Sequence, residues 1–145
     1  MFVLTIASPL FCPPQTCCAV ERVLIHRSLY ESIIKAVVKE TIAFSHLGNP
    51  LSEKTTIGPM ALPSAINNIQ VLVDDAREKG AKILLGGKKA VLSEAPNARF
   101  YEPTVIADVT PDMRIFHEEV FGPVISMMPV EDDRHAIQVS SRAHQ

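Results

Sequence analysis

The chain has 145 residues, of which 47% are hydrophobic and 21% charged, and its formal net charge at pH 7 is −2. This is the composition of an ordinary globular protein, which excludes intrinsic disorder over most of the chain, and the length fits one domain. Acidic and basic residues are mixed and form no Lys/Arg cluster, so we expect no nucleic-acid partner and no basic face that binds a membrane.

The three cysteines are Cys12, Cys17 and Cys18. An odd number, with two residues adjacent, does not form a disulfide framework and favours a reducing compartment. We therefore expect a cytoplasmic protein, with a mitochondrial location as the open alternative. The five histidines are scattered, and no Cys/His spacing matches a zinc site, so we expect no bound metal.

Residues 1–14 are an apolar segment that differs from the rest of the chain. The apolar run of about a dozen residues is shorter than the roughly 20 that span a bilayer. A secretory signal is the weaker interpretation, because the first basic residue is Arg22 and no clear cleavage site follows. A buried strand, or a segment ill-matched to the remainder, is the stronger one. Pro13 and Pro14 then interrupt any regular element.

The first two expected elements follow the cysteines. Residues 22–26 contain three consecutive aliphatic side chains, which predicts a short strand buried on both faces. Ser28 and Glu31 have the spacing of a capping box, so a helix is expected to begin at Ser28 and to end before residues 47–50. Its apolar period predicts one buried face, made of Tyr30, Ile33, Ile34, Val37, Val38 and Thr41.

A second helix is expected from about Pro63 to Lys79. Proline is favoured in a first turn, and Gly80 suits the position that follows a helix. The predicted buried stripe is Ile66, Ile69, Leu72, Val73 and Ala76. Residues 81–85 then predict a strand, which two glycines end.

Residues 88–106 give weaker patterns. Small and polar residues over 88–98 predict a solvent-facing loop. Residues 100–106 predict a strand, in which Pro103 permits only an edge position or a bulge because proline has no backbone N–H.

The C-terminal part adds a short helix that begins near Thr110, a strand over 121–128 and a helix that starts near Asp132. Residues 138–145 are polar and without period, which predicts an unstructured tail. Helices and strands alternate along the chain, so the fold class is α/β. A G-x-G-x-x-G fingerprint is absent, so we expect no dinucleotide-phosphate site in this sequence.

Residues 15–19, with the sequence Gln-Thr-Cys-Cys-Ala, could supply a nucleophile. A cysteine attacks as its thiolate, which is a minor species near neutral pH unless a cation or a helix N-terminus favours it. Arg22 is near in sequence. On the residues alone, however, free cysteines such as Cys17 and Cys18 are more often small buried hydrophobes.

Residues 118–124, with the sequence Glu-Glu-Val-Phe-Gly-Pro-Val, could contact a ligand. Adjacent carboxylates are usually solvated, but an aromatic ring next to a glycine can pack against a flat ligand, and a carboxylate can accept bonds from ribose hydroxyls. His117 could shuttle protons, although a solvated histidine at a helix end is the stronger interpretation.

Taken together, these stretches resemble the aldehyde dehydrogenase superfamily. Residues 15–19 resemble its Gly-Gln-x-Cys motif, and residues 118–124 resemble its Glu-Glu-(Ile/Val)-Phe-Gly-Pro-Val segment. Further matches follow the family's order: Gly48-Asn49-Pro50, Ile57-Gly58-Pro59, Glu78-Lys79-Gly80-Ala81, Gly86-Gly87 and Tyr101-Glu102-Pro103-Thr104-Val105. The resemblance covers residues 15–137 and implies a partial catalytic domain of that family, between an unrelated segment 1–14 and the tail 138–145.

The resemblance also implies roles for three residues. Cys17 would be the nucleophile, since it stands two positions after Gln15. Glu119 would hold the nicotinamide-side ribose of NAD or NADP, and Phe121 would pack near the nicotinamide. The implied substrate is an aldehyde, which is oxidised to a carboxylic acid through a thiohemiacetal and a thioester on the cysteine, without a metal.

Departures from the family pattern limit the expected activity. Pro14 stands where the family has glycine, and Cys12 where it usually has asparagine. The family's general-base glutamate, its oxyanion asparagine and its Rossmann domain lie upstream of the cysteine and have no place in this chain. We therefore expect little or no dehydrogenase activity from the chain alone. Two alternatives are a non-catalytic fragment, which forms homo-oligomers or associates with full-length subunits, and a cofactor-independent thiol enzyme acting through Cys17.

Overall fold

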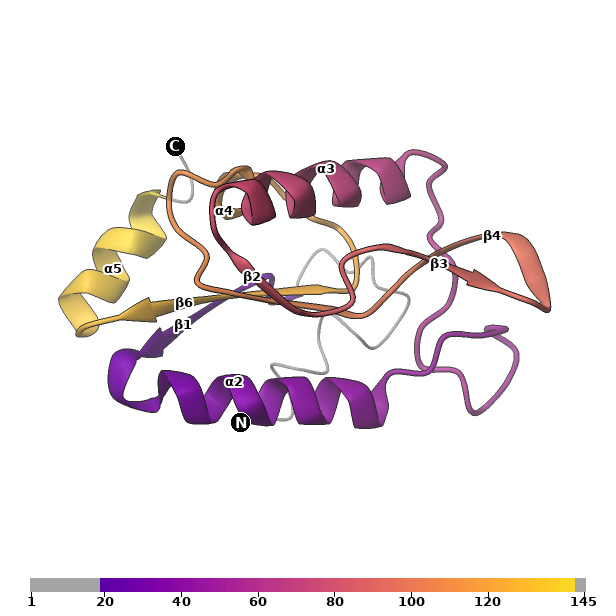
Figure 1. Cartoon of the computed structure of the whole chain (residues 1–145), viewed down its shortest axis with the longest axis horizontal. Helices are drawn as coiled ribbons and strands as arrows, with labels where there is room; N and C mark the ends of the chain where they lie inside the picture. The colour runs from indigo at the N-terminus through magenta and orange to yellow at the C-terminus, as the bar shows by residue number, and fades with distance from the viewer. Residues whose placement is uncertain (1–18, 143–145) are drawn as a thin grey trace.

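A four-stranded sheet with helices on both faces forms the body of the protein, whose structure is a computed structural model that describes residues 19–142 (Figure 1). Helix α2 covers one face, and helices α3 and α4 cover the other. The α/β class predicted from the sequence is confirmed. Cys12, Cys17 and Cys18 lie outside the described residues.

The sheet has the strand order β1-β6-β5-β2. Strands β1 (Arg22–His26) and β5 (Thr104–Ala107) both run parallel to the central strand β6 (Val124–Val130). Strand β2 (Lys82–Leu85) pairs antiparallel with β5. All four residues of β5 are buried, and so are six of the seven in β6, so these two strands are the centre of the core.

Strand β1 is found where it was predicted, and its expected burial on both faces is confirmed only in part. Ile25 is buried and Val23 packs on the same face, and Leu24 packs against the core of the opposite face, but Val23 and Leu24 are only partly buried and His26 is exposed. The physical reason is position, because β1 pairs only with β6 in the described part of the chain and so lies at an edge of the sheet.

Helix α2 (Arg27–Phe44) buries the predicted apolar face, with Tyr30, Val37 and Thr41 fully buried. The predicted capping box is wrong. The helix begins at Arg27, so Ser28 is already in the first turn, and the ring of His26 accepts the Ser28 amide at 3.3 Å.

Helix α3 (Ala65–Glu78) confirms the second helix and buries its whole predicted stripe. Gly80 follows it with a φ of 98°, a left-handed conformation that glycine adopts without steric cost. On the same face of the sheet lies the short helix α4 (Arg114–His117), which begins later than expected.

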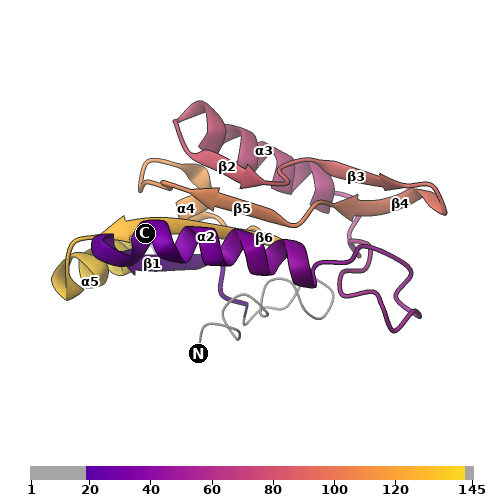
Figure 2. The same cartoon turned by 60° about the horizontal axis from the view of Figure 1, so that its bottom comes forward.

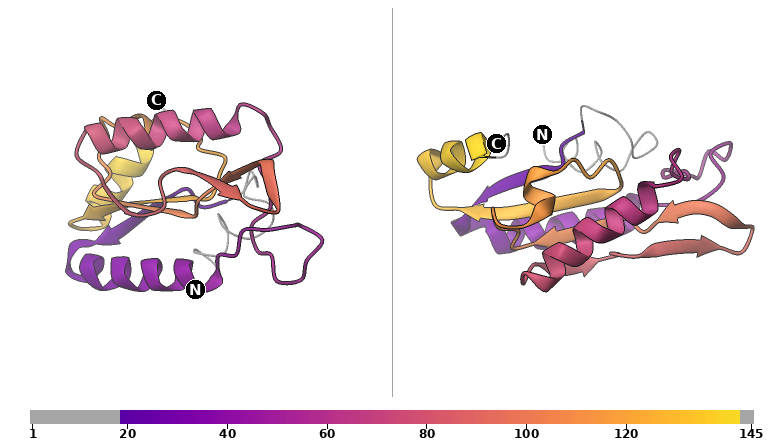
Figure 3. Two further views of the ribbon diagram at one scale, coloured as in Figure 1. Left: turned by 45° about the vertical axis from the view of Figure 1, so that its right-hand side comes forward. Right: turned by 90° about the horizontal axis from the view of Figure 1, so that it is seen from above.

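A β-hairpin replaces the loop predicted over 88–98. Strands β3 (Lys89–Leu92) and β4 (Ala95–Tyr101) pair antiparallel and extend away from the main sheet (Figures 2 and 3). The loop prediction is wrong because most of these side chains face solvent. In β3 only Ala90 is buried, so the sequence lacks the apolar alternation that predicts a strand.

Pro103 divides the strand that was predicted over 100–106. Strand β4 ends at Tyr101 and β5 begins at Thr104, and the two belong to different sheets. The expected edge position is also wrong, because β5 is a central strand. Proline lies between the two ladders, where its missing N–H removes no sheet hydrogen bond.

The C-terminal elements also differ from their predicted limits. Strand β6 begins at Val124 rather than at residue 121. Helix α5 (Asp133–Arg142) includes residues 138–142, so the prediction of an unstructured tail is wrong for them. Val139 is the one buried residue of α5, and a single apolar anchor is too weak a pattern to predict a helix. None of the helices in the described range is long and apolar enough to span a membrane.

Candidate functional site

The pairing of β1 with β6 joins two stretches that are about a hundred residues apart in sequence. The strands are parallel, so their N-terminal ends lie at the same end of the sheet, and Arg22 stands opposite Ser126 (Figure 1). Residues 19–21 lead into β1, and residues 118–123 lead into β6. Cys17 lies outside the described residues, two positions before Ala19 in the chain.

Glu21 makes the closest contact between these two stretches. Its Oε1 accepts the backbone N–H groups of Val120 and Phe121, each at 3.2 Å. Its own backbone carbonyl accepts the Ser126 N–H at 3.1 Å. Both the side chain and the main chain of Glu21 therefore bind the segment 118–126.

Arg22 adds a second contact to the same segment. Its Nη2 donates to the backbone carbonyl of Glu118 at 3.2 Å. Its Nε is buried and meets no acceptor within residues 19–142. Two consecutive residues of the chain thus hold residues 118 to 121, because Arg22 binds the beginning of this stretch and Glu21 binds its end.

The backbone of the segment is unusual at Phe121 and crowded at Gly122. Phe121 has a φ of 44°, in the left-handed region that few residues other than glycine adopt. Such conformations persist only where surrounding contacts enforce them. Gly122 is buried against α3, and a β-carbon there would overlap Cδ1 of Ile69. Pro123 accepts the Thr104 N–H at 2.8 Å, which ties the segment to β5.

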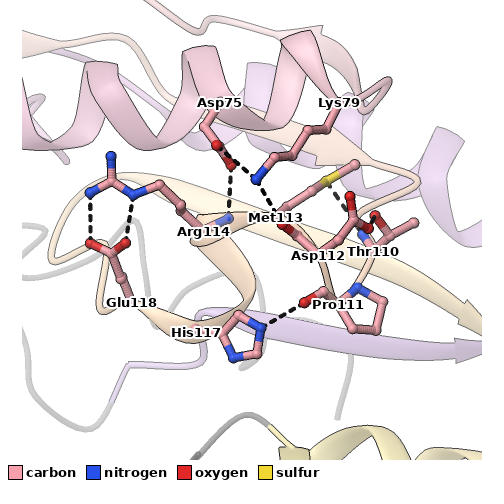
Figure 4. Close-up of polar contacts among 9 residues, drawn as sticks. All are labelled: Asp75, Lys79, Thr110, Pro111, Asp112, Met113, Arg114, His117 and Glu118. Atoms are coloured by element: carbon pink, nitrogen blue, oxygen red, sulfur yellow. Dashed lines mark hydrogen bonds and ion pairs between the residues drawn. The ribbon is translucent and has the colours of Figure 1, made fainter.

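A polar network fixes α4, the helix that precedes the segment (Figure 4). Asp75 of α3 accepts the Arg114 backbone N–H at 2.8 Å and pairs with Lys79 at 2.9 Å. Lys79 also donates to the carbonyl of Asp112 at 2.7 Å. These contacts link the last turns of α3 to the first turn of α4.

The adjacent carboxylates Glu118 and Glu119 have different environments. Glu118 accepts two hydrogen bonds from the guanidinium of Arg114, at 2.6 and 3.1 Å (Figure 4). These bonds lower the pKa of Glu118 below its ordinary value. Glu119 is exposed and has no hydrogen-bond or ion-pair partner in the described part of the chain. The carboxylate of Glu118 is thus bound within the protein, and that of Glu119 faces solvent without a protein partner in the described residues.

His117 has a local partner rather than a catalytic one. Its Nε2 lies 2.6 Å from the carbonyl oxygen of Pro111 (Figure 4). A carbonyl only accepts, so Nε2 carries the hydrogen and donates it. This contact favours the interpretation of His117 as a histidine at a helix end. Within residues 19–142 no group of three or more His, Cys, Asp or Glu side chains is arranged to hold a metal.

A family model described as "Aldehyde dehydrogenase family" matches residues 4–144. The chain belongs to the aldehyde dehydrogenase family. The family match includes most of the segment 1–14 and of the tail 138–145, which the sequence motifs had left outside. The resemblance on which the sequence analysis rested is therefore confirmed for the family.

Two curated relatives show the extent of the similarity. The mitochondrial succinate-semialdehyde dehydrogenase of Oryza sativa subsp. japonica is 38% identical over 127 residues, which are 88% of this chain and 23% of the relative. The D-glyceraldehyde dehydrogenase (NADP(+)) of Picrophilus torridus is 44% identical over 112 residues, which are 77% of this chain and 22% of the relative. The chain thus spans about a quarter of the length of these aldehyde dehydrogenases.

A solved structure has the same fold. A point mutant of betaine aldehyde dehydrogenase from Staphylococcus aureus, crystallised with NAD+, superimposes with a TM-score of 0.89 and 31% sequence identity. The match covers 97% of this chain and 28% of that enzyme.

Sequence reasoning found the two stretches of the site but missed Glu21, which connects them. Its contacts with Val120 and Phe121 depend on strand pairing across about a hundred residues, which no local pattern reveals. The pair of Arg114 and Glu118 did carry a local signal, because residues four apart on a helix are neighbours.

Proposed function

We propose that the chain supplies the cysteine nucleophile and part of the nicotinamide-contacting wall of an NAD- or NADP-dependent aldehyde dehydrogenase. Cys17 acts as the nucleophile, and Glu119 and Phe121 contact the cofactor. One observation carries this proposal: parallel pairing of β1 with β6 brings residues 19–21, which follow the cysteines, against the segment 118–123.

The residues of the segment fit a dinucleotide. The carboxylate of Glu119 is exposed and unpaired within the described residues, so it can accept hydrogen bonds from the vicinal hydroxyls of a ribose. Phe121 is half-buried, which leaves part of its ring available to a flat group, and Gly122 adds no side chain beside it. NAD+ in the structure of the Staphylococcus aureus enzyme and NADP(+) in the name of the Picrophilus torridus relative support this cofactor class.

The proposed chemistry proceeds on the sulfur of Cys17. The thiolate attacks the aldehyde carbon, an S–C bond forms, and the carbonyl oxygen becomes the oxyanion of a thiohemiacetal. When bound, NAD+ or NADP+ supplies the hydride acceptor that converts the thiohemiacetal into a thioester. Water then adds to the thioester carbon and one of its protons passes to solvent, the S–C bond breaks, and the carboxylic acid leaves as the thiolate returns.

Assayed by itself, the 145-residue chain should produce little or no NADH from an aldehyde. The reason is the extent of the match, since the chain spans only 23% of the length of the Oryza sativa relative. The nucleophile can still be tested, because acyl transfer to a thiol requires no hydride acceptor.

The test uses p-nitrophenyl acetate, which transfers an acetyl group to a reactive thiolate. We expect mass spectrometry of peptides from the purified chain to find the acetyl thioester on Cys17. The C17S variant should lose this modification, and C18S, the matched control, should keep it. No acetylation, or equal acetylation of the three cysteines, would contradict the proposed nucleophile.

Association with longer subunits, without catalysis, is the second candidate. It is supported by the open edge of β1, which pairs only with β6 within the described residues and so leaves backbone groups available to another strand. Co-elution of the chain with a full-length aldehyde dehydrogenase in size-exclusion chromatography would support this candidate. A strictly monomeric chain that never co-elutes would exclude it.

A further inference from the structure

We propose that Glu21 is a positioning residue that holds the backbone of Val120 and Phe121, in the segment proposed to contact the cofactor. The proposal rests on the proposed function in one respect, namely that residues 119 and 121 contact a nicotinamide dinucleotide. The contact of Glu21 with the two amides is a property of the fold, and it can be measured without any cofactor.

The geometry of Glu21 is that of a clamp on two consecutive amides. One carboxylate oxygen accepts both the Val120 and the Phe121 N–H groups at 3.2 Å. A carboxylate is the strongest acceptor among the side chains for such groups. Two adjacent amides that bond one oxygen restrict the dihedral angles of Val120, which lies between them, and hold the peptide plane that leads into Phe121, the residue whose φ is 44°. The clamp therefore fixes the chain on the N-terminal side of the strained residue.

The clamp is anchored at the beginning of β1. The backbone carbonyl of Glu21 accepts the Ser126 N–H at 3.1 Å, as the first bond of the pairing between β1 and β6. Glu21 is four residues after Cys17 in the sequence.

Neighbouring contacts do not duplicate this clamp. Arg22 binds the carbonyl of Glu118, which is an acceptor and leaves the amides of residues 120 and 121 unaffected. Gly122 packs against Ile69, which fixes the depth of the segment but supplies no hydrogen bond to those amides. In the described part of the chain, the N–H groups of Val120 and Phe121 both donate to Glu21.

The experiment compares E21A with E21Q in the full 145-residue chain. Glutamine keeps an acceptor oxygen at the same reach, and alanine removes it. E53A is the matched control, since Glu53 is exposed in the loop between α2 and α3. Three quantities are measured for each variant: amide hydrogen exchange of Val120 and Phe121 by NMR, the melting temperature, and NADH binding by fluorescence.

We expect E21A to accelerate exchange at these two amides by about tenfold and to weaken NADH binding several-fold, with E21Q and E53A close to wild type. Unchanged exchange in E21A would overturn the proposal. Equal losses in E21A and E21Q, accompanied by lower melting temperatures, would also overturn it, because they would indicate a role in stability alone. A wild-type chain that shows not even weak NADH binding through the ribose and nicotinamide would reject the proposed cofactor contact, and amide exchange would still decide the role of Glu21.

Discussion

Gly122 lies against Ile69 so closely that a β-carbon on residue 122 would overlap the Cδ1 atom of the isoleucine. Both residues are buried, and Cε of Met60 would lie 3.7 Å from the same β-carbon. Helix α3 therefore sets how deeply the segment 118–124 sits on the sheet. The segment cannot accept even a methyl group at this position without displacement of its neighbours.

The substitution G122A should reduce the free energy of unfolding by about 1–3 kcal/mol, the usual cost of overpacking a core. Urea denaturation measures this loss. The double variant G122A/I69V removes Cδ1 and should recover part of it relative to I69V alone. Additive losses in the double variant would contradict the proposed contact, since residues that share a clash do not behave independently.

The hydroxyl of Tyr30 connects α2 to the sheet. It donates to the Met127 carbonyl at 3.3 Å and accepts the Asp108 N–H at 2.7 Å. Burial also raises the pKa of Tyr30, in agreement with an enclosed neutral phenol. The variant Y30F leaves both partners without this bond and should cost about 1–3 kcal/mol of stability, as measured by urea denaturation.

Tyr101 offers a matched control for that experiment. Its hydroxyl makes one bond, to the side-chain oxygen Oε1 of Gln70 at 3.1 Å, whereas the Tyr30 hydroxyl bonds two backbone groups. Y101F should therefore cost less than Y30F. A larger loss of stability in Y101F than in Y30F would contradict the prediction that the two bonds of Tyr30 to the backbone stabilise the fold more than the one bond of Tyr101.

The ion pair of Arg114 and Glu118 should make stability depend on acid pH. The hydrogen bonds from Arg114 lower the pKa of Glu118 in the folded chain. When the pKa of a carboxyl is lower in the folded chain than in the unfolded chain, its ionised form stabilises the fold at any pH above the unfolded-state pKa. This stabilisation is lost as the pH falls through the folded-state pKa. Wild type should thus exceed E118Q in stability at pH 7, and the difference should shrink below about pH 5.

Denaturation curves at several pH values measure this difference. E119Q is the matched control, because Glu119 has no ion-pair partner within residues 19–142. A stability difference between wild type and E118Q that stays constant from neutral to acid pH would refute the pairing. The effect should be small, since the pair is about half exposed.

Glu119 and Phe121 are predicted to act on the ligand rather than on the fold. E119A should leave the melting temperature within about 2 °C of wild type, as expected for an exposed side chain without partners. It should weaken, by about fivefold or more, the NADH binding that the ribose and nicotinamide contacts provide without a phosphate site, as measured by fluorescence. Unchanged NADH affinity in E119A would remove Glu119 from the site.

Local patterns predicted the buried elements well. The spacing of Ile66, Ile69 and Ala76 predicted α3, and all three are buried where expected. The hairpin of β3 and β4 was missed because its strands carry mostly exposed side chains. The effect of Pro103 was predicted only in part. That proline restricts a strand can be read from the local sequence, but the separation of β4 and β5 into different sheets depends on pairing with strands elsewhere in the chain.

For the site, motifs were sufficient to find the residues but not their contacts. Glu119 and Phe121 were selected by resemblance to a family segment, and their roles in binding stay predictions. The carboxylate of Glu21 looks like any other acid in the sequence. Only the fold reveals that it faces Val120 and Phe121.

The reactivity of Cys17 relative to Cys12 and Cys18 is the most direct test of Cys17 as the nucleophile. Alkylation by iodoacetamide reports the thiolate fraction and the access of each thiol, and mass spectrometry resolves the three rates in one sample. We expect Cys17 to react about tenfold or more faster than the other two cysteines. Equal rates, or a faster reaction at Cys12 or Cys18, would contradict the assignment of Cys17 as the nucleophile.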